Sequence, residues 1–292
     1  MATTVYKRKR IGEGMIKLRR GMTYVGMGLL IVSVLFPVYY LFSHSLKGEA
    51  LIRAIYSQPM GLWERVFPKP FYINLDQYYR LLFRTPQYLV YFWNTLWVVV
   101  PIVFLQLLLS ILAAFGFSKL KFWGSETLFF IYIIMMLMPF QVTLVPNYII
   151  LSKLRLLDSY KALILPGAFG TFGVFFLKQF MEGIDASFIE EAHLLGASDR
   201  QVLSYILVPM CKPVIVSAAV LLFIDYWSMV EQPLIFISTK EKLPLSVYLS
   251  SLAMSNIHIG FACSVLYMVL PLLLVIYAQD DLSDGLKISS LK

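Results

Sequence analysis

The chain has 292 residues, of which 59 % are hydrophobic and 14 % charged, and it carries a formal net charge of +8. A soluble domain needs more charge than this on its water-facing surface, so the composition excludes an ordinary soluble protein and indicates an integral membrane protein. The two cysteines, Cys211 and Cys263, lie far apart in apolar segments, so the sequence shows neither a disulfide framework nor a cysteine metal site.

The first 20 residues hold a block of basic side chains ahead of the first apolar run. The block consists of Lys7, Arg8, Lys9, Arg10, Lys17, Arg19 and Arg20. Basic residues that precede a membrane span mark the cytoplasmic side, so we interpret this charge as a topology signal and not as a nucleic-acid surface. We therefore expect a cytoplasmic segment over residues 1–21, contact with membrane lipid, and no nucleic-acid partner.

Apolar runs long enough to cross a bilayer follow in chain order. A spanning helix needs about 20 mostly apolar residues. Six runs meet this requirement, at 22–44, 91–117, 128–148, 160–180, 213–237 and 261–278. The predicted fold class is an all-α integral membrane protein, with six transmembrane helices over 22–278 and a tail over 279–292. Since an even number of spans returns the chain to its starting side, both termini are expected in the cytoplasm.

The loop over 44–87 is long, external in this topology, and rich in Tyr, Phe and Pro. Its segment YINLDQYYRLLF, residues 72–83, has the pattern of an amphipathic helix. Such a helix lies in the membrane interface or packs as a cap over the helical bundle, and the pattern fits both arrangements.

Several polar side chains fall inside the predicted spans. They are Gln106, Gln141, Asn147, Asp225, Glu231 and Gln232. Burying such groups is costly, and Pro139 and Pro146 in the third run free backbone carbonyls that need partners in protein or in a water-filled cavity. The pattern fits a polar path for a substrate, and it equally fits hydrogen bonds between helices or spans that end closer to water.

Motifs for covalent chemistry and nucleotide binding are missing from the sequence. No Gly-rich loop ends in Gly-Lys-Ser/Thr, so the chain has no visible means of binding ATP. His44, His193 and His258 lie in separate segments, and no metal site is expected. GAFGTFG, residues 167–173, sits in an apolar run, where small residues allow close helix packing. An intramembrane enzyme needs several convergent catalytic groups, and the sequence shows no such set. We therefore expect no catalytic residue and no bound cofactor.

The stretch SFIEEAHLLGASDRQVLSYILVP, residues 187–209, is a polar segment between the fourth and fifth runs. Ser187 with Glu190, and Ser198 with Gln201, have the form of capping boxes, and Gly196 suits the left-handed residue that ends a helix. We expect two short helices joined at LGAS. The apolar positions at helical spacing are Ile189, Ala192 and Gly196 on the first helix, and Val202, Ile206 and Met210 on the second. This pattern is suited to docking into a partner's groove, and a loop that only connects spans also fits it.

The same stretch resembles the cytoplasmic signature loop of permease subunits from ATP-driven, binding-protein-dependent (ABC) importers. That family pattern is Glu-Ala-Ala, three residues, Gly, nine residues, and Ile-x-Leu-Pro. The chain matches this spacing with Glu190, Glu191, Ala192, Gly196, Ile206, Leu207, Val208 and Pro209. Glu191 replaces the first Ala, and Val208 replaces Leu. Other segments, NTLWVV, MPFQVTLVPNYIILSKLRLLDSYKALILP, FGVFFLKQFM, PLIFIS and LPLSVYL, are similar to the carbohydrate-importer (MalG-like) branch, so the resemblance covers most of the chain.

The resemblance implies a type I importer permease of the bacterial cytoplasmic membrane. Its coupling loop, over about 182–212, would sit in a cleft of an ATPase subunit. The implied coupling residues are Glu190, Glu191, Ala192, Leu195, Gly196, Ala197, Ser198 and Pro209. The implied partners are a second permease subunit (MalF-like), two ATPase subunits and an extracellular solute-binding protein. ATP and Mg would bind at the partner ATPase and not at this chain.

The chain departs from the branch at three places. Leu195 stands where an Asp usually precedes the signature Gly, the usual Asn-Trp-Asn is Tyr226-Trp227-Ser228, and the tail adds Asp280 and Asp281. The candidate substrate-path residues are Gln141, Asn147, Asp225, Tyr226, Trp227, Glu231 and Gln232. The predicted function is import of a sugar or oligosaccharide by alternating access. The alternatives are the same architecture for a non-sugar cargo, and a membrane scaffold or sensor that moves no cargo.

Overall fold

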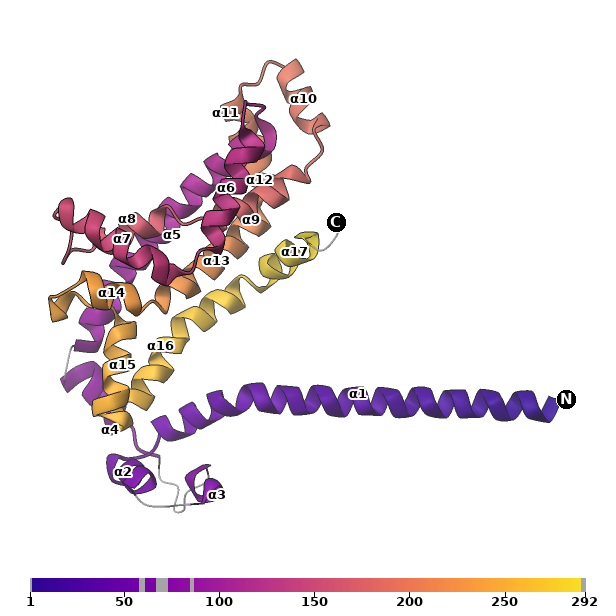
Figure 1. Ribbon diagram of the computed structural model, residues 1–292. Coiled ribbons are helices and arrows are strands. Elements are labelled where there is room, and N and C mark those ends of the chain that lie inside the picture. Colours follow the sequence, from indigo (N-terminus) through magenta and orange to yellow (C-terminus); the bar gives the residue numbers. More distant parts are fainter. Residues whose placement is uncertain (1, 58–60, 67–72, 85–86, 290–292) are drawn as a thin grey trace. The chain divides into compact units, whose positions relative to one another are not determined.

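The computed structural model describes residues 2–57, 61–66, 73–84 and 87–289, which contain helices and turns but no strand. The longer helices are α1 (Ala2–Ser45), α5 (Gln87–Lys119), α6 (Ser125–Leu137), α7 (Phe140–Lys153), α9 (Phe172–Glu182), α13 (Lys212–Trp227), α15 (Leu245–Ser255), α16 (Ile257–Tyr277) and α17 (Gln279–Ser289). The shorter helices are α2 (Glu49–Ser57), α3 (Leu62–Val66), α4 (Asp76–Tyr79), α8 (Lys161–Ala168), α10 (Ser187–Leu194), α11 (Asp199–Val202), α12 (Val208–Met210) and α14 (Glu231–Phe236). Figure 1 labels most of them along the chain. The predicted all-α fold class is confirmed.

The chain divides into two compact units, and each is described by itself. The first comprises Met1–Tyr79 with Ile257–Val265, and the second comprises Arg80–Asn256 with Leu266–Lys292. The ends of the two predicted terminal segments, residue 1 and residues 290–292, lie outside the described residues.

The first unit is held together by aromatic packing at the end of α1. The rings of Tyr40 and His44 stack with centroids 3.8 Å apart, and Phe261 of α16 packs against both. The described part of the predicted amphipathic segment, residues 73–83, contains α4 (Asp76–Tyr79). Tyr78 of α4 donates a hydrogen bond to Ser45 Oγ at 2.7 Å. These contacts favour a segment packed against the end of α1 over a helix lying free in the interface.

The number of spans differs from a simple count of six straight helices. Among the described residues, four helices are long and apolar enough to cross a membrane: Arg20–Ser45, Gln87–Lys119, Lys161–Glu182 (α8 and α9 together) and Ile257–Tyr277. The number rises to six if each of two bent pairs forms one span.

The third predicted run, 128–148, is one of these bent pairs and not a single helix. Helices α6 and α7 meet at an angle of 99° across Met138 and Pro139. Met138 has φ −68° and ψ 128°, the extended backbone that the residue before a proline prefers, and Pro139 has no N–H to continue the helix. The two facts together explain the bend.

The fifth predicted run, 213–237, is longer than the single helix that the structure contains there. Helix α13 ends at Trp227, and Glu231 and Gln232 begin the separate helix α14. The break follows from Pro233, which cannot donate a hydrogen bond to the Met229 carbonyl. The Ser246 hydroxyl donates to that carbonyl instead. Glu231 and Gln232 therefore lie beyond the end of this span.

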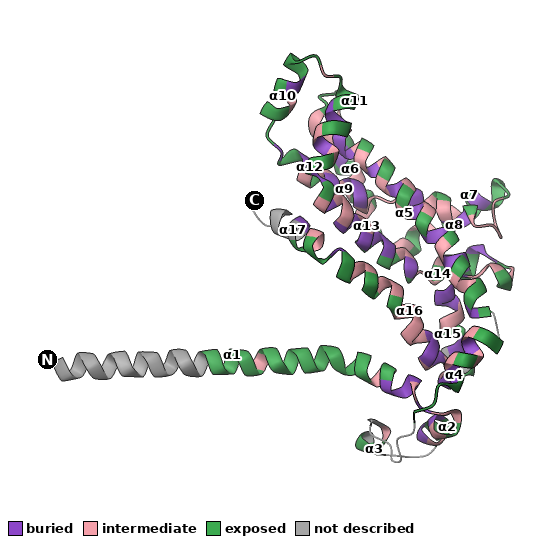
Figure 2. Cartoon of the chain, turned by 180° about the vertical axis from the view of Figure 1, so that it is seen from behind, coloured by how far each residue is buried: buried purple, intermediate pink, exposed green. Residues whose placement is uncertain are grey.

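The second unit is built around α5, which packs against α8, α9, α13 and α15. Three glycines let α8 and α9 approach α5 closely. A Cβ at Gly167 would lie 2.8 Å from Ile102 Cγ2, and a Cβ at Gly173 would lie 2.4 Å from Ser110 Oγ. Gly170 faces Gln106 in the same way. The predicted packing role of GAFGTFG is confirmed, and Figure 2 shows buried residues gathered along these helices.

Candidate functional site

The polar stretch after α9 folds as the predicted pair of short helices. Helix α10 ends in a Schellman motif: the Ala197 N–H donates to the Ala192 carbonyl at 3.0 Å, and the Gly196 N–H donates to the His193 carbonyl at 2.9 Å. Gly196 has φ +86°, the left-handed backbone that favours glycine. The predicted joint at LGAS is confirmed.

The start of α10 differs from the predicted capping box. Ser187 lies inside the helix, and its N–H donates to Asp185 Oδ1 at 3.0 Å. Asp185 stands two residues earlier and offers an acceptor that satisfies this N–H, so Ser187 and Glu190 do not form a box. Hydrogen bonds from Ser187 hold the pKa of the Asp185 carboxyl below its usual range.

The second box forms, but the helix after it is distorted. Gln201 Oε1 accepts hydrogen bonds from the Ser198 N–H at 2.8 Å and the Ser198 hydroxyl at 2.9 Å. A π turn over Leu203–Leu207 follows α11, and a π turn shifts the side chains that come after it around the helix axis. The buried residues are therefore Val202, Leu203, Leu207 and Cys211. The predicted face of Val202, Ile206 and Met210 was wrong at Met210, which is exposed.

Most of the predicted coupling residues are exposed, and one, Ala192, is buried. Ala192 packs in a core with residues of α5, α9 and α13, whereas Glu190, Glu191, Leu195, Gly196, Ser198 and Pro209 are exposed and Ala197 is half-buried. Leu194 and Leu195 expose 87 % and 89 % of their surface. Figures 1 and 2 show α10 at one end of the second unit. An apolar tip beside two carboxylates is a surface suited to a protein partner.

A cavity of about 550 Å³ lies where two helices are broken, between α6 and α7 and between α8 and α9. Three predicted path residues line it: Asn147, Tyr226 and Gln232. The Tyr226 hydroxyl donates to the Gly167 carbonyl at 3.1 Å. Gln232 Oε1 is buried and has no hydrogen-bond partner among the described residues. The cavity thus brings together polar groups that stand up to 85 positions apart in the sequence (147 to 232).

The other four path candidates lie elsewhere. Gln141 Nε2 donates to Glu231 Oε2 at 3.4 Å, and Asp225 is exposed on α13. Trp227 is only 2 % exposed; its ring stacks on Phe223, and its Nε1 donates to the Tyr267 carbonyl at 3.3 Å. Trp227 therefore packs in the core of the second unit in this conformation.

Sequence reasoning missed three lining residues, Thr143, Phe169 and Thr171. Each stands within five residues of a helix break, at Pro139 or at Gly170. Prolines and glycines that interrupt an apolar run were the signal that could have located them.

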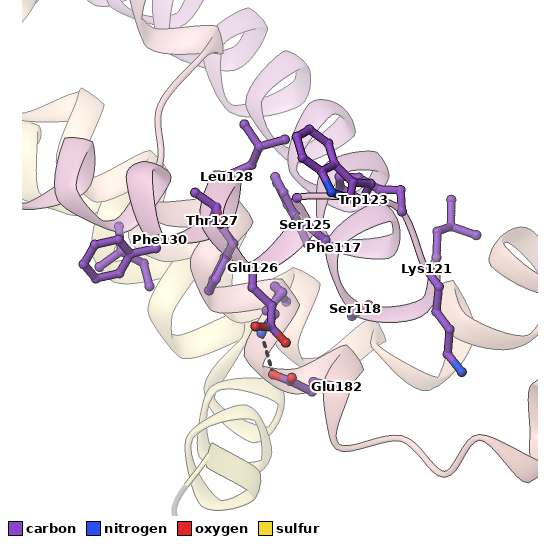
Figure 3. A pocket seen from close by; sticks show the side chains of 16 residues that line it. Phe117, Ser118, Lys121, Trp123, Ser125, Glu126, Thr127, Leu128, Phe130 and Glu182 are labelled. Carbon is purple, nitrogen blue, oxygen red and sulfur yellow. Dashed lines mark hydrogen bonds and ion pairs between the residues drawn. The ribbon is translucent and has the colours of Figure 1, made fainter.

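A larger cavity, of about 1280 Å³, lies at the turn between α5 and α6 (Figure 3). Its wall is charged as well as aromatic. Lys178 Nζ lies 2.7 Å from Glu182 Oε2 and 4.4 Å from the centroid of the Phe129 ring. Trp123 is 99 % exposed at the rim. Lys119, at the end of α5, donates from Nζ to the Ile184 carbonyl at 2.7 Å, which puts this turn at the same end of the unit as α10. None of the predicted site residues lines this cavity.

No group of three or more His, Cys, Asp or Glu side chains that could hold a metal occurs among the described residues. The described architecture is that of a helical membrane protein, with an exposed helix pair at one end and, at the helix breaks, a mainly apolar cavity that contains a few polar groups.

The chain belongs to the family of binding-protein-dependent transport system inner membrane components, whose model matches residues 106–286. It is similar to the arabinooligosaccharides transport system permease protein AraQ of Bacillus subtilis, with 26 % identity over 90 % of this chain and 92 % of that protein. It is also similar to the polygalacturonan/rhamnogalacturonan transport system permease protein YtcP of the same organism, with 31 % identity over 49 % of this chain and 50 % of that protein.

Solved structures agree on the fold. A bacterial ABC transporter involved in the import of the acidic polysaccharide alginate matches with a TM-score of 0.73 at 23 % identity, covering 89 % of this chain and 94 % of that one. The family predicted from the signature loop is confirmed, and with it the permease fold of a transporter family of the inner membrane.

Proposed function

We propose that this chain is a transmembrane permease subunit of an ATP-driven importer that moves a sugar or oligosaccharide into the cell. Relatives named for oligosaccharide transport support the cargo class, since several are similar to this chain over most of its length. An extracellular solute-binding protein delivers the cargo, and a second permease subunit completes the path. Both termini lie in the cytoplasm.

The observation that carries the proposal is the exposed tip of α10, held in a fixed orientation by the Gly196 joint. An ATPase subunit binds this tip in a cleft, with Leu194 and Leu195 in apolar contact and Glu190 paired to a basic group. ATP and Mg bind at that ATPase, and this chain binds no cofactor. The family pattern in residues 190–209 supports this role.

Coupling follows from rigid-body motion. When the two ATPase subunits close on ATP, they carry α10 with them. The buried side of the loop packs through Ala192, Leu207 and Cys211 against α5, α9 and α13, so the motion passes to the spans. Transport then alternates between inward-open and outward-open states, and the energy enters through contacts that differ between the two states.

The test is co-purification from the native membrane in mild detergent, with partners identified by mass spectrometry. The wild-type chain should bring down a second permease and an ATPase. The Leu194→Glu variant should lose the ATPase by about tenfold or more, because it puts a charge at the centre of the docking surface, and should keep the second permease. Leu75→Glu is the control, an exposed leucine (59 %, against 87 % at Leu194) that lies far from the loop in sequence.

Other outcomes separate the alternatives. Recovery of the chain alone, in a preparation that keeps other complexes intact, would favour a scaffold or sensor. Recovery of the full complex whose ATPase responds to a peptide or lipid-like compound, and to no sugar, would favour the same architecture with another cargo.

A further inference from the structure

The cavity at the helix breaks differs from the cavity at the α5–α6 turn in carrying no ionised side chain. None of the described residues that line it is Asp, Glu, Lys, Arg or His. We propose that it is this chain's subsite for a neutral glycosyl unit, and that it selects neutral oligosaccharides over uronic-acid oligosaccharides. This inference rests on the proposed function and narrows its substrate class.

The polar groups of the cavity match the hydroxyls of a sugar. Asn147 and Gln232 offer amides that both donate and accept, and Thr143 and Thr171 offer hydroxyls. Gln232 Oε1 is the group most in need of a partner, because it is buried and unpaired among the described residues. A sugar hydroxyl can donate to it once the Gln232 side chain turns this oxygen toward the cavity, and that bond removes the cost of leaving the acceptor unsatisfied.

The apolar part of the wall suits the carbon face of a sugar ring. Phe140 and Phe169 line the cavity, and Phe169 exposes 70 % of its surface. A wall that is mostly apolar and aromatic, with a few placed polar groups, is typical of small-molecule sites, and about 550 Å³ lies within their usual range.

A carboxylate would be poorly placed in this cavity. It would leave water without meeting an opposite charge, and burying an unpaired ion costs far more than burying a hydroxyl. Charged neighbours outside the lining do not change this result, since they carry both signs and are exposed: Asp225, Glu231, Lys153 and Arg155. The relatives named for arabinooligosaccharides and for polygalacturonan show that the family as a whole does not decide between neutral and acidic cargo.

The experiment measures uptake in the native cell with this chain deleted and then restored. The probes are labelled neutral trisaccharides (arabinotriose, galactotriose, mannotriose) and labelled uronic trisaccharides (trigalacturonate and an alginate trimer). Uptake of at least one neutral probe should depend on the chain, and uptake of no uronic probe should. Asn147→Leu combined with Gln232→Leu should lower neutral uptake about tenfold or more, while Gln87→Leu, an exposed glutamine at the start of α5, should leave it unchanged.

Each result decides the proposal. Chain-dependent uptake of a uronic probe at a rate equal to the neutral probes overturns the neutral subsite and leaves the proposed importer standing. Unchanged neutral uptake in the double variant overturns the role of this cavity. Uptake of neither class by the restored wild type overturns both the subsite and the sugar importer. Co-purification of the double variant with its partners shows that a loss of uptake does not come from misfolding.

Discussion

The joint after α10 and the cavity at the α6–α7 and α8–α9 breaks both occur where helices are interrupted, but different interactions hold them. The joint rests on bonds that span at most five positions, such as Ala197 N–H to the Ala192 carbonyl and Ser198 N–H to Gln201. The cavity rests on bonds between distant residues, such as Tyr226 to the Gly167 carbonyl, 59 positions away. The joint is therefore a local structure, whereas the cavity exists only when the helices around it are packed.

This difference suits two separate tasks. A local joint keeps its shape while the loop moves as a rigid body. A displacement imposed by a partner is then transmitted to the spans and does not bend the joint. A cavity built from several helices changes shape when those helices shift, and alternating access requires such a change. Substitutions should therefore act over a short range at the joint and over a long range around the cavity.

The largest effect on stability is expected at the contact between α8 and α5. Gly167→Ala would put a Cβ 2.8 Å from Ile102 Cγ2, and Ile102 is fully buried and, being β-branched, stiff at χ1. Overpacking of this kind costs about 1–3 kcal/mol. The measurement is the denaturation midpoint of the purified chain in detergent.

Gly116→Ala is the control, because no heavy atom lies within 4 Å of its new Cβ. It should be neutral or slightly stabilising, since alanine favours a helix over glycine. In a double-mutant cycle, Gly167→Ala should cost less in an Ile102→Ala background than in the wild type, because the clashing side chain is then gone. Equal midpoints for the two single variants would show that α8 and α5 are not packed as described.

The next effect is on coupling. Gly196→Val forces a β-branched residue into the left-handed region at φ +86°, at a cost of about 1–2 kcal/mol or more. The joint should rearrange and turn α10, so that uptake falls while the ATPase of the assembled complex still hydrolyses ATP. Gly124→Val is the matched control, because Gly124 also has positive φ (+81°) and open space around its Cβ. It should strain the chain equally and spare coupling. Normal uptake in Gly196→Val would contradict the coupling role.

A pH-dependent effect is expected at Asp158, which ties the turn after α7 to the loop after α14. Its carboxylate accepts hydrogen bonds from the Thr239 N–H at 2.8 Å and the Thr239 hydroxyl at 2.6 Å, and it pairs with Lys242 at 3.2 Å. These partners hold the pKa of Asp158 far below its ordinary value of 3.8. A lowered folded-state pKa stabilises the fold above the ordinary value, and this stability is lost as the pH falls below about 4.

The measurement is the thermal midpoint of the wild type and Asp158→Asn between pH 3 and pH 7. The variant should be less stable at pH 7 and should lose less stability on acidification, because its side chain does not titrate. Asparagine tolerates the φ of +58° at this position, so backbone strain does not account for the difference. Parallel pH profiles would show that the Asp158 carboxylate does not make these bonds to Thr239 and Lys242.

How much the sequence could predict follows the same division. Gly196 and the Ser198–Gln201 pair were identified because their partners lie within a few residues. Pro139 itself signalled the bend, because a proline interrupts a helix. A count of apolar residues ignores that signal, and it joined α6 and α7 into one run. The grouping of Asn147, Tyr226 and Gln232 could not be predicted, since it depends on how α7, α13 and α14 pack. The π turn at Leu203–Leu207 was not predicted either. The prediction assumed regular helical spacing, and that spacing places Met210 on the buried face.

The smallest effect is expected at the capping box, and it tests whether the joint is local. Gln201→Leu removes the acceptor of both Ser198 bonds. An exposed cap contributes about 0.5–1 kcal/mol, too little to shift the midpoint of the whole chain clearly. Hydrogen exchange resolves it instead, since local opening exposes individual amides. The Ser198 amide should exchange several-fold faster, while the exchange rates of the amides of α7, α8 and α14 around the cavity should not change.

Gly167→Ala should produce the opposite pattern, with faster exchange around the cavity and unchanged exchange at the joint. A change at both places in either variant would mean that the joint and the cavity form one cooperative unit, and the loop would then pass strain to the cavity even before a partner moves it.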